Sequence, residues 1–205
     1  MIELVNVKPT KENKQFSVQI QSGSMVCITG DYRNNLLRII GGLNIPYEGN
    51  VFVNNRNLIQ MSEDKRTIFR KRIMSYLYNS DNLIDGLTVK DNILLASHLD
   101  KSNVCSDQLL KITDQLRISK DMLNIYPSSL STLQKFIVAL ARGLVSQHQF
   151  ILVEDLDLLQ NIKHIEDYFG ILKVINQTNN ITIIVTLADS KEQFSLFDQE
   201  IIYDI

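Results

Sequence analysis

The chain has 205 residues, 44% of them hydrophobic and 21% charged, which is enough for one domain with a sizeable apolar core. Its net charge of −2 gives no electrostatic reason to expect nucleic acid as a partner. No apolar run approaches the ~18–20 residues that span a bilayer, and the polar start does not resemble a signal peptide. Cys27 and Cys105 form neither a metal-ligand spacing nor a disulfide framework. We therefore expect an intracellular globular domain.

A strand, a tight turn and a helix are predicted in the first part of the chain, after two early strands. Alternation over Phe16–Ile20, and a looser alternation over Ile2–Val7, predict the early strands. The apolar run Met25–Thr29 predicts a third strand, which meets Gly30. A helical pattern follows, carried by Leu36, Leu37, Ile39 and Ile40. Junctions of this kind bind phosphates in nucleotide-binding folds.

The middle of the chain alternates between strands and helices. A strand is predicted over Asn50–Val53 and another over Ile73–Tyr78. The helix predicted between them, over Ser62–Arg72, carries a basic run that is more often a solvated helix face than a binding surface. Thr88 with Asp91 forms a capping box that opens the next helix. A further helix is predicted within residues 102–122.

The last part contains a helix opened by a capping box, two buried strands and a second long helix. Ser131 and Gln134 form the capping box, before an apolar stripe at helical spacing. Phe150–Val153 predicts a buried strand that ends in acidic residues, and Ile181–Thr186 predicts an interior parallel strand. Apolar residues at helical intervals over 162–175 predict the helix between them, and a last strand is expected over residues 201–203.

Five ordered segments together resemble the ATP-binding subunits of ABC transporters, especially those of lipoprotein-releasing and of macrolide or peptide exporters. The segments read GGLNIPYEGNVFV, NLIDGLTVKDNILL, YPSSLSTLQKFIVALARGLV, FILVED and TIIVT. The resemblance implies an α/β, P-loop NTPase-like ABC ATPase fold, with a mixed β-sheet core, an antiparallel β part and a helical subdomain. It implies a single domain over 1–205, with the core at 1–79 and 135–205 and the helical subdomain at about 80–134.

The phosphate-binding loop of that family is reduced to a remnant. The family has about nine residues between the first loop glycine and a Leu-Leu pair, so three missing residues shorten the reach by roughly 10 Å. Two loop glycines, the lysine and the magnesium-ligand hydroxyl are all absent. The remnant consists of Gly30, Asp31, Arg33, Asn34 and Asn35.

Four other motifs also depart from the family pattern. Ser131 and Gln134 are a remnant of the signature motif. Between them, Thr132 and Leu133 stand where the family has two glycines, which let backbone N–H groups approach a phosphate. Asn79 stands at the place of the glutamine that senses magnesium, and is one methylene shorter. Glu154 and Asp155 reverse the family order of aspartate and glutamate, which moves both carboxylates by about a methylene. Because general-base catalysis depends on hydrogen-bond reach, we expect this swap to impair it. The histidine that contacts the γ-phosphate is missing after the Ile181–Thr186 strand.

The resemblance with these departures implies a degenerate ATP-binding-type subunit of an exporter-like ABC transporter. We expect it to be unable to bind or hydrolyse ATP by itself, with no catalytic residue, no metal site and no cofactor, and ATP–magnesium held only weakly or through a partner. Expected partners are a membrane-spanning transporter subunit and a second ATP-binding subunit in a homo- or heterodimer, at the cytoplasmic side of a membrane. Two alternatives remain: a soluble scaffold protein derived from the fold, and an active ATPase whose remodelled loop uses Arg33.

Overall fold

The computed structural model describes residues 1–78, 83–100, 106–156, 165–188 and 194–203. The chain divides into two compact units, one formed by Met1–Tyr76 with Gln149–Ile205 and the other by Leu77–His148. The second unit includes the helix that follows Ser131, whereas the division expected from the sequence placed residues from 135 onward with the core. Within the described ranges, no helix combines the length and the apolar character needed to cross a membrane.

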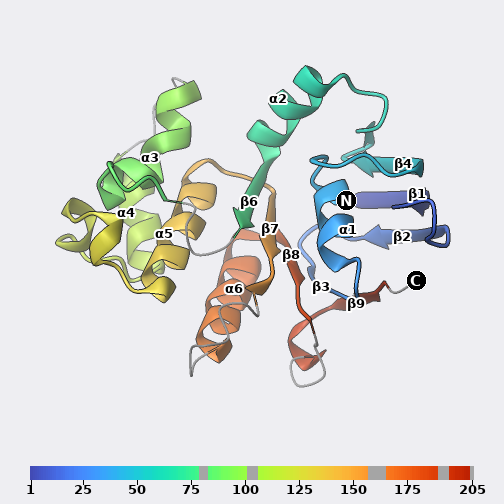
Figure 1. Cartoon of the computed structure of the whole chain (residues 1–205). Coiled ribbons are helices and arrows are strands. Elements are labelled where there is room, and N and C mark those ends of the chain that lie inside the picture. Colours follow the sequence, from blue (N-terminus) through green and yellow to red (C-terminus); the bar gives the residue numbers. More distant parts are fainter. Residues whose placement is uncertain (79–82, 101–105, 157–164, 189–193, 204–205) are drawn as a thin grey trace. The chain divides into compact units, whose positions relative to one another are not determined.

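An antiparallel sheet in the first unit has the strand order β2-β1-β4-β5 (Figure 1). Alternating side chains of β1 face the core, and Leu4 lies opposite Val18 on one side and Val51 on the other. This alternation is the one expected for strands with one buried face. The strands are β1 (Ile2–Lys8), β2 (Phe16–Ile20), β4 (Glu48–Val53) and β5 (Arg56–Asn57).

A second sheet has the order β6-β7-β8-β3-β9. Every residue of β3, β7 and β8 is buried, as their uninterrupted apolar and β-branched runs predict for interior parallel strands. Strand β3 pairs in parallel with β8 and β9, and β7 pairs in parallel with β8, so these four strands end at one edge of the sheet. The strands are β3 (Met25–Thr29), β6 (Met74–Tyr78), β7 (Phe150–Glu154), β8 (Thr182–Thr186) and β9 (Gln199–Ile202).

Helices α1 (Arg33–Ile40) and α6 (Ile165–Asn179) pack on this second sheet. Helix α1 contacts β3, β7 and β8, and its buried face consists of Leu36, Leu37, Ile39 and Ile40. Helix α2 (Glu63–Ile73) begins after Ser62, whose side chain caps it, and buries Phe69. A short 3₁₀ helix, η4 (Phe194–Leu196), precedes β9.

The second unit is helical. Helix α3 begins at the expected cap, where the Asp91 N–H donates to the Thr88 hydroxyl. The side chain of the fully buried Asn92 connects the first turn of α3 to the preceding loop by donating to the carbonyls of Ile84, Leu87 and Thr88. The elements are α3 (Val89–Asp100), α4 (Ser106–Gln115), the 3₁₀ helices η1 (Met122–Asn124) and η2 (Pro127–Ser129), and α5 (Thr132–Val145).

The helix expected within residues 102–122 is α4, which stops at Gln115. Arg117 has a left-handed φ of 55°, and the Ile118 N–H turns back to donate to the Thr113 carbonyl at 2.8 Å. This closing geometry ends an α-helix. The predicted fold class is confirmed, since an antiparallel sheet, a parallel sheet and a helical unit are all present.

Candidate functional site

The turn between β3 and α1 is short. Gly30 adopts a φ of +96°, a conformation that side chains other than glycine rarely take. Helix α1 begins at Arg33, whose backbone N–H donates to the Gly30 carbonyl at 3.2 Å. The preceding Tyr32 caps the helix without a side-chain hydrogen bond, and the first turn contains no acidic residue. The strand therefore passes into the helix with no extended loop between them.

The side chains of the first two residues of α1 turn toward Asp155, the residue that follows β7. Arg33 Nη2 lies 3.2 Å from Asp155 Oδ1 as an ion pair without hydrogen-bond alignment, and Asn34 Nδ2 donates to Asp155 Oδ2 at 2.6 Å. Arg33 Nη1 also donates to the Gly30 carbonyl at 3.3 Å. Asp155 has a left-handed φ of 47°, which aspartate tolerates better than most residues. The sequence remnants at 33, 34 and 155 thus form one contact network.

Thr186, at the end of β8, completes a ring of hydrogen bonds with these residues. Its hydroxyl accepts from the Asp155 backbone N–H at 2.7 Å and donates to Asn34 Oδ1 at 2.7 Å. Since Asn34 in turn donates to Asp155, the ring joins β7, β8 and the first turn of α1. Thr186 is completely buried, so none of its bonds is exchanged with water.

Glu154, the last residue of β7, forms a second network. Its side chain is 1% exposed, and Arg38 in the last turn of α1 contacts both carboxylate oxygens: Nε donates to Oε2 at 3.1 Å and Nη2 pairs with Oε1. The Tyr76 hydroxyl donates to Oε2. The hydrogen bond to Glu154 raises the pKa of Arg38 above its ordinary value, and burial, together with that same carboxylate, raises the pKa of Tyr76.

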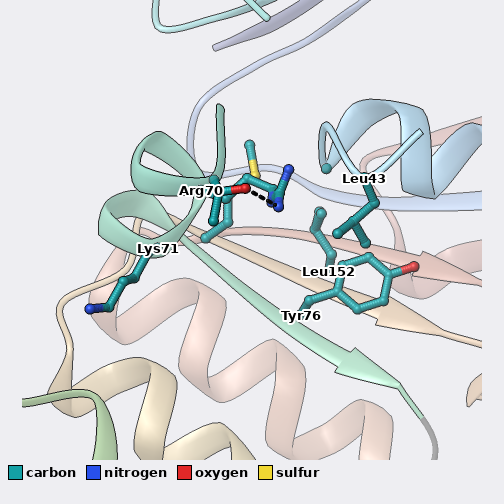
Figure 2. A pocket seen from close by; sticks show the side chains of 8 residues that line it. Leu43, Arg70, Lys71, Tyr76 and Leu152 are labelled. Carbon is teal, nitrogen blue, oxygen red and sulfur yellow. Dashed lines mark hydrogen bonds between the residues drawn. The ribbon is translucent and has the colours of Figure 1, made fainter. Parts of the chain in front are cut away.

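Tyr76 also borders a cavity of about 300 Å³ in the first unit. Figure 2 shows the Leu43, Tyr76 and Leu152 side chains converging on it, while the Lys71 ammonium points away. Arg70 lies at the cavity and donates to the Gly42 carbonyl at 2.6 Å and to the Thr67 hydroxyl at 2.9 Å. Burial lowers the pKa of Arg70. The cavity wall and the Glu154 network therefore share the Tyr76 side chain.

The remaining predicted site residues lie elsewhere. Asp31 is exposed in the turn, and Asn35 accepts a hydrogen bond from Asn44 at 2.7 Å. Asn79 is outside the described residues. In the second unit, Ser131 and Gln134 form the predicted capping box: the Ser131 N–H donates to Gln134 Oε1 at 2.9 Å, and the Gln134 N–H donates to the Ser131 hydroxyl at 3.2 Å.

Sequence reasoning missed Arg38, Tyr76 and Thr186. Arg38 stands 116 residues from Glu154 and has the appearance of an ordinary cation in the last turn of a helix. Tyr76 and Thr186 belong to apolar strands whose patterns indicate burial alone. Only the strand order, with β6 and β8 on either side of β7, brings their hydroxyls to the carboxyl end of β7.

Comparisons with known proteins agree with this architecture. A family model described as ABC transporter matches residues 13–155. The chain is 30% identical over 178 residues to an uncharacterized ABC transporter ATP-binding protein, MJ1508, of Methanocaldococcus jannaschii, covering 84% of this chain and 79% of that protein. It is 24% identical over 190 residues to the bacitracin export ATP-binding protein BceA of Halalkalibacterium halodurans, covering 88% and 75%.

A solved structure has the same fold. The dimeric post-hydrolysis structure of the ATP-binding cassette MJ0796 bound to ADP and Pi superimposes with a TM-score of 0.81 and 24% identity, covering 100% of this chain and 96% of the other. The family predicted from the sequence is confirmed, and the chain belongs to the ABC transporter family as an ATP-binding domain.

Proposed function

We propose that the chain is a degenerate ATP-binding subunit of an exporter-like ABC transporter that acts as a structural or regulatory partner and neither binds nor hydrolyses ATP by itself. The observation that carries this proposal is the β3–α1 turn. Helix α1 begins at Arg33, so only Asp31 and Tyr32 separate it from Gly30. Two residues span at most about 7 Å, which is too short to wrap a triphosphate.

The donors that a phosphate would need are also reduced at this turn. The Arg33 N–H is already bonded to the Gly30 carbonyl. No lysine, serine or threonine occurs between Gly30 and Leu36, so the turn offers neither an ammonium group nor a hydroxyl ligand for magnesium. Phosphoryl transfer depends on positioning and charge neutralisation by such groups. The residues present therefore do not fit a magnesium–triphosphate group of the family's kind.

The signature segment supports the same proposal. The Ser131 hydroxyl and the Gln134 side chain are used to cap α5. Thr132 and Leu133 place side chains where the family has glycines. A side chain at such a position keeps backbone N–H groups away from a phosphate. A homodimer of this chain would accordingly lack a complete site on both faces, which favours a heterodimer with a competent ATP-binding subunit.

The relatives indicate the kind of assembly. BceA is named as an export ATP-binding protein, and a second solved structure of MJ0796 is described as the dimeric structure of a bacterial ABC transporter cassette. We infer that this chain joins a membrane-spanning transporter subunit, as part of a dimer of ATP-binding subunits, and that it works at the cytoplasmic side of the membrane through that partner.

Among the alternatives, an active ATPase based on Arg33 is disfavoured because this guanidinium already pairs with Asp155 and the Gly30 carbonyl. Binding a phosphate would require breaking both contacts. A soluble scaffold protein derived from the fold remains the second candidate, because the fold alone does not specify assembly with a membrane protein.

The test is purification of the tagged chain from detergent-extracted membranes of its own cells, followed by nucleotide labelling. The expected result is stoichiometric recovery of a multi-span membrane protein, with photoreactive ATP labelling a companion ATP-binding subunit rather than this chain. Recovery of the chain alone, without any membrane protein, would support the scaffold function. Labelling of this chain in isolation would support the active ATPase.

A further inference from the structure

Two acidic residues lie at the carboxyl end of β7, and each forms an ion pair with an arginine of α1: Glu154 with Arg38, and Asp155 with Arg33. We propose that the chain supplies its own ions here: Arg38 takes the place of a metal cation at Glu154, and Asp155 takes the place of a bound anion at the first turn of α1. Such internal ions keep α1 fastened to the sheet without nucleotide or magnesium, and they would do so whether or not the proposed function holds.

Arg38 reaches Glu154 as an external cation would. The Glu154 side chain is 1% exposed, whereas the Arg38 side chain is 40% exposed, so the guanidinium comes in from the solvent side while the carboxylate stays buried. A buried carboxylate is unfavourable unless a charge and hydrogen bonds compensate it. The guanidinium provides a positive charge and contacts to both oxygens, in the two-pronged geometry for which arginine is suited.

Tyr76 provides a further donor to the same carboxylate. Its raised pKa means that the hydroxyl keeps its proton, and hence its role as donor, well beyond neutral pH. Glu154 thus has three hydrogen-bond donors from two side chains, an arrangement that satisfies the carboxylate with no metal ion.

Asp155 serves the other end of α1. A helix N-terminus favours a negative charge, yet the first turn of α1 contains no acidic residue and starts with the cation Arg33. The Asp155 carboxylate supplies the missing negative charge from outside the helix, through Arg33 and Asn34. Thr186 holds the Asp155 backbone and the Asn34 amide in register with each other.

Both ends of α1 are therefore anchored to the carboxyl end of β7. Asp155 holds the first turn, and Glu154 holds the last turn through Arg38. In a site that used external ions, this connection would depend on ligand binding. Here it is encoded in the chain, and α1 stays fastened to β7 and β8 without a bound ligand.

The test compares Arg38→Met with Arg72→Met by chemical unfolding between about pH 5 and pH 8. Arg72 is an exposed arginine in the last turn of α2, so its substitution removes the same charge without a buried partner. Arg38→Met is expected to lower the folding equilibrium constant roughly a hundredfold at pH 8, because it leaves a buried carboxylate unpaired. Arg72→Met is expected to follow the wild type at every pH.

The pH profile separates a counter-ion from a packing role. Without Arg38, a negative charge on the buried Glu154 side chain has no cation beside it. Because a buried, uncompensated charge costs most where carboxylates are ionised, the deficit of Arg38→Met should shrink as the pH falls toward 5 and grow as it rises. Lost packing alone would give the same deficit at every pH.

Glu154→Gln in the Arg38→Met background is the second variant. It removes the unpaired charge, so the double variant should regain most of the lost stability and lose the pH dependence, and it should fold even if Arg38→Met does not. Millimolar magnesium chloride should leave the wild-type Tm unchanged. The proposal is overturned if Arg38→Met behaves like Arg72→Met, if Glu154→Gln fails to rescue it, or if magnesium stabilises the wild type. Tight ATP binding by the wild type would refute the proposed function alone.

Discussion

Thr186→Val tests the ring of hydrogen bonds that joins β7, β8 and α1. Valine has nearly the shape of threonine but no hydroxyl, so the substitution removes two hydrogen bonds of 2.7 Å at a completely buried position. The Asp155 N–H loses its acceptor, which costs about 1–3 kcal/mol for a buried donor, and the lost bond to Asn34 adds about 0.5–1.5 kcal/mol.

The added apolar surface of the valine methyl offsets part of this loss, so the expected decrease in the free energy of unfolding is about 2–3 kcal/mol. For a chain of this length, this loss corresponds to a decrease in Tm of about 4–12 °C. Urea unfolding followed by circular dichroism measures the first quantity, and a thermal melt measures the second.

Thr186→Ser is the matched control, because it keeps the hydroxyl and removes one methyl group. It should cost about 1 kcal/mol from lost burial, less than the valine substitution. If Thr186→Val were as stable as Thr186→Ser or more so, the hydroxyl would contribute nothing and the ring would not hold the strand ends together.

Three further predictions concern other parts of the chain. Gly49→Ala should lower the free energy of unfolding by at least about 2 kcal/mol, because Gly49 has a φ of +96° and a Cβ there would lie 2.3 Å from the Asn6 carbonyl oxygen. Gly86→Ala is the control: nothing lies within 4 Å of its Cβ, so urea unfolding should give a change of less than about 0.5 kcal/mol. Equal effects of the two substitutions would contradict this geometry. The free energy of unfolding should fall as the pH rises past 10.0, because the folded state holds the Tyr76 proton that the unfolded state releases. Tyr76→Phe should therefore be less stable at neutral pH, and its stability should decline less steeply at alkaline pH. An unchanged alkaline slope would argue against a raised Tyr76 pKa. Asn92→Ala should lower stability by about 2–4 kcal/mol, because the Ile84 N–H and the Leu87 carbonyl lose their partner at a buried position. The Ile84 and Thr88 carbonyls lose one of two donors and keep a backbone N–H. A thermal melt indistinguishable from the wild type would refute that role.

Local patterns in the sequence predict most elements of the fold. The uninterrupted apolar runs correctly indicate that β3, β7 and β8 are interior strands, and the Ser131–Gln134 spacing correctly predicts the cap of α5. Phe16 begins the strand that alternation predicts over Phe16–Ile20; it packs against the core and has its ring centroid 4.5 Å from that of Tyr203.

The candidate site is less accessible to such patterns. The short Gly30–Leu36 turn is visible in the sequence, because it depends on residues adjacent in the chain. The partners of Glu154 and Asp155 are not, because they come from α1, β6 and β8, and only the parallel strand order brings those elements together. Sequence spacing also gives no indication that Arg38 points toward β7, since a helix of eight residues has several faces.

Isothermal titration calorimetry of the purified chain with magnesium–ATP, up to millimolar concentration, measures whether the domain holds ATP by itself. We expect no saturable heat. A saturable isotherm with a micromolar Kd, abolished by Arg33→Ala, would contradict it and show that the shortened turn grips a triphosphate after all.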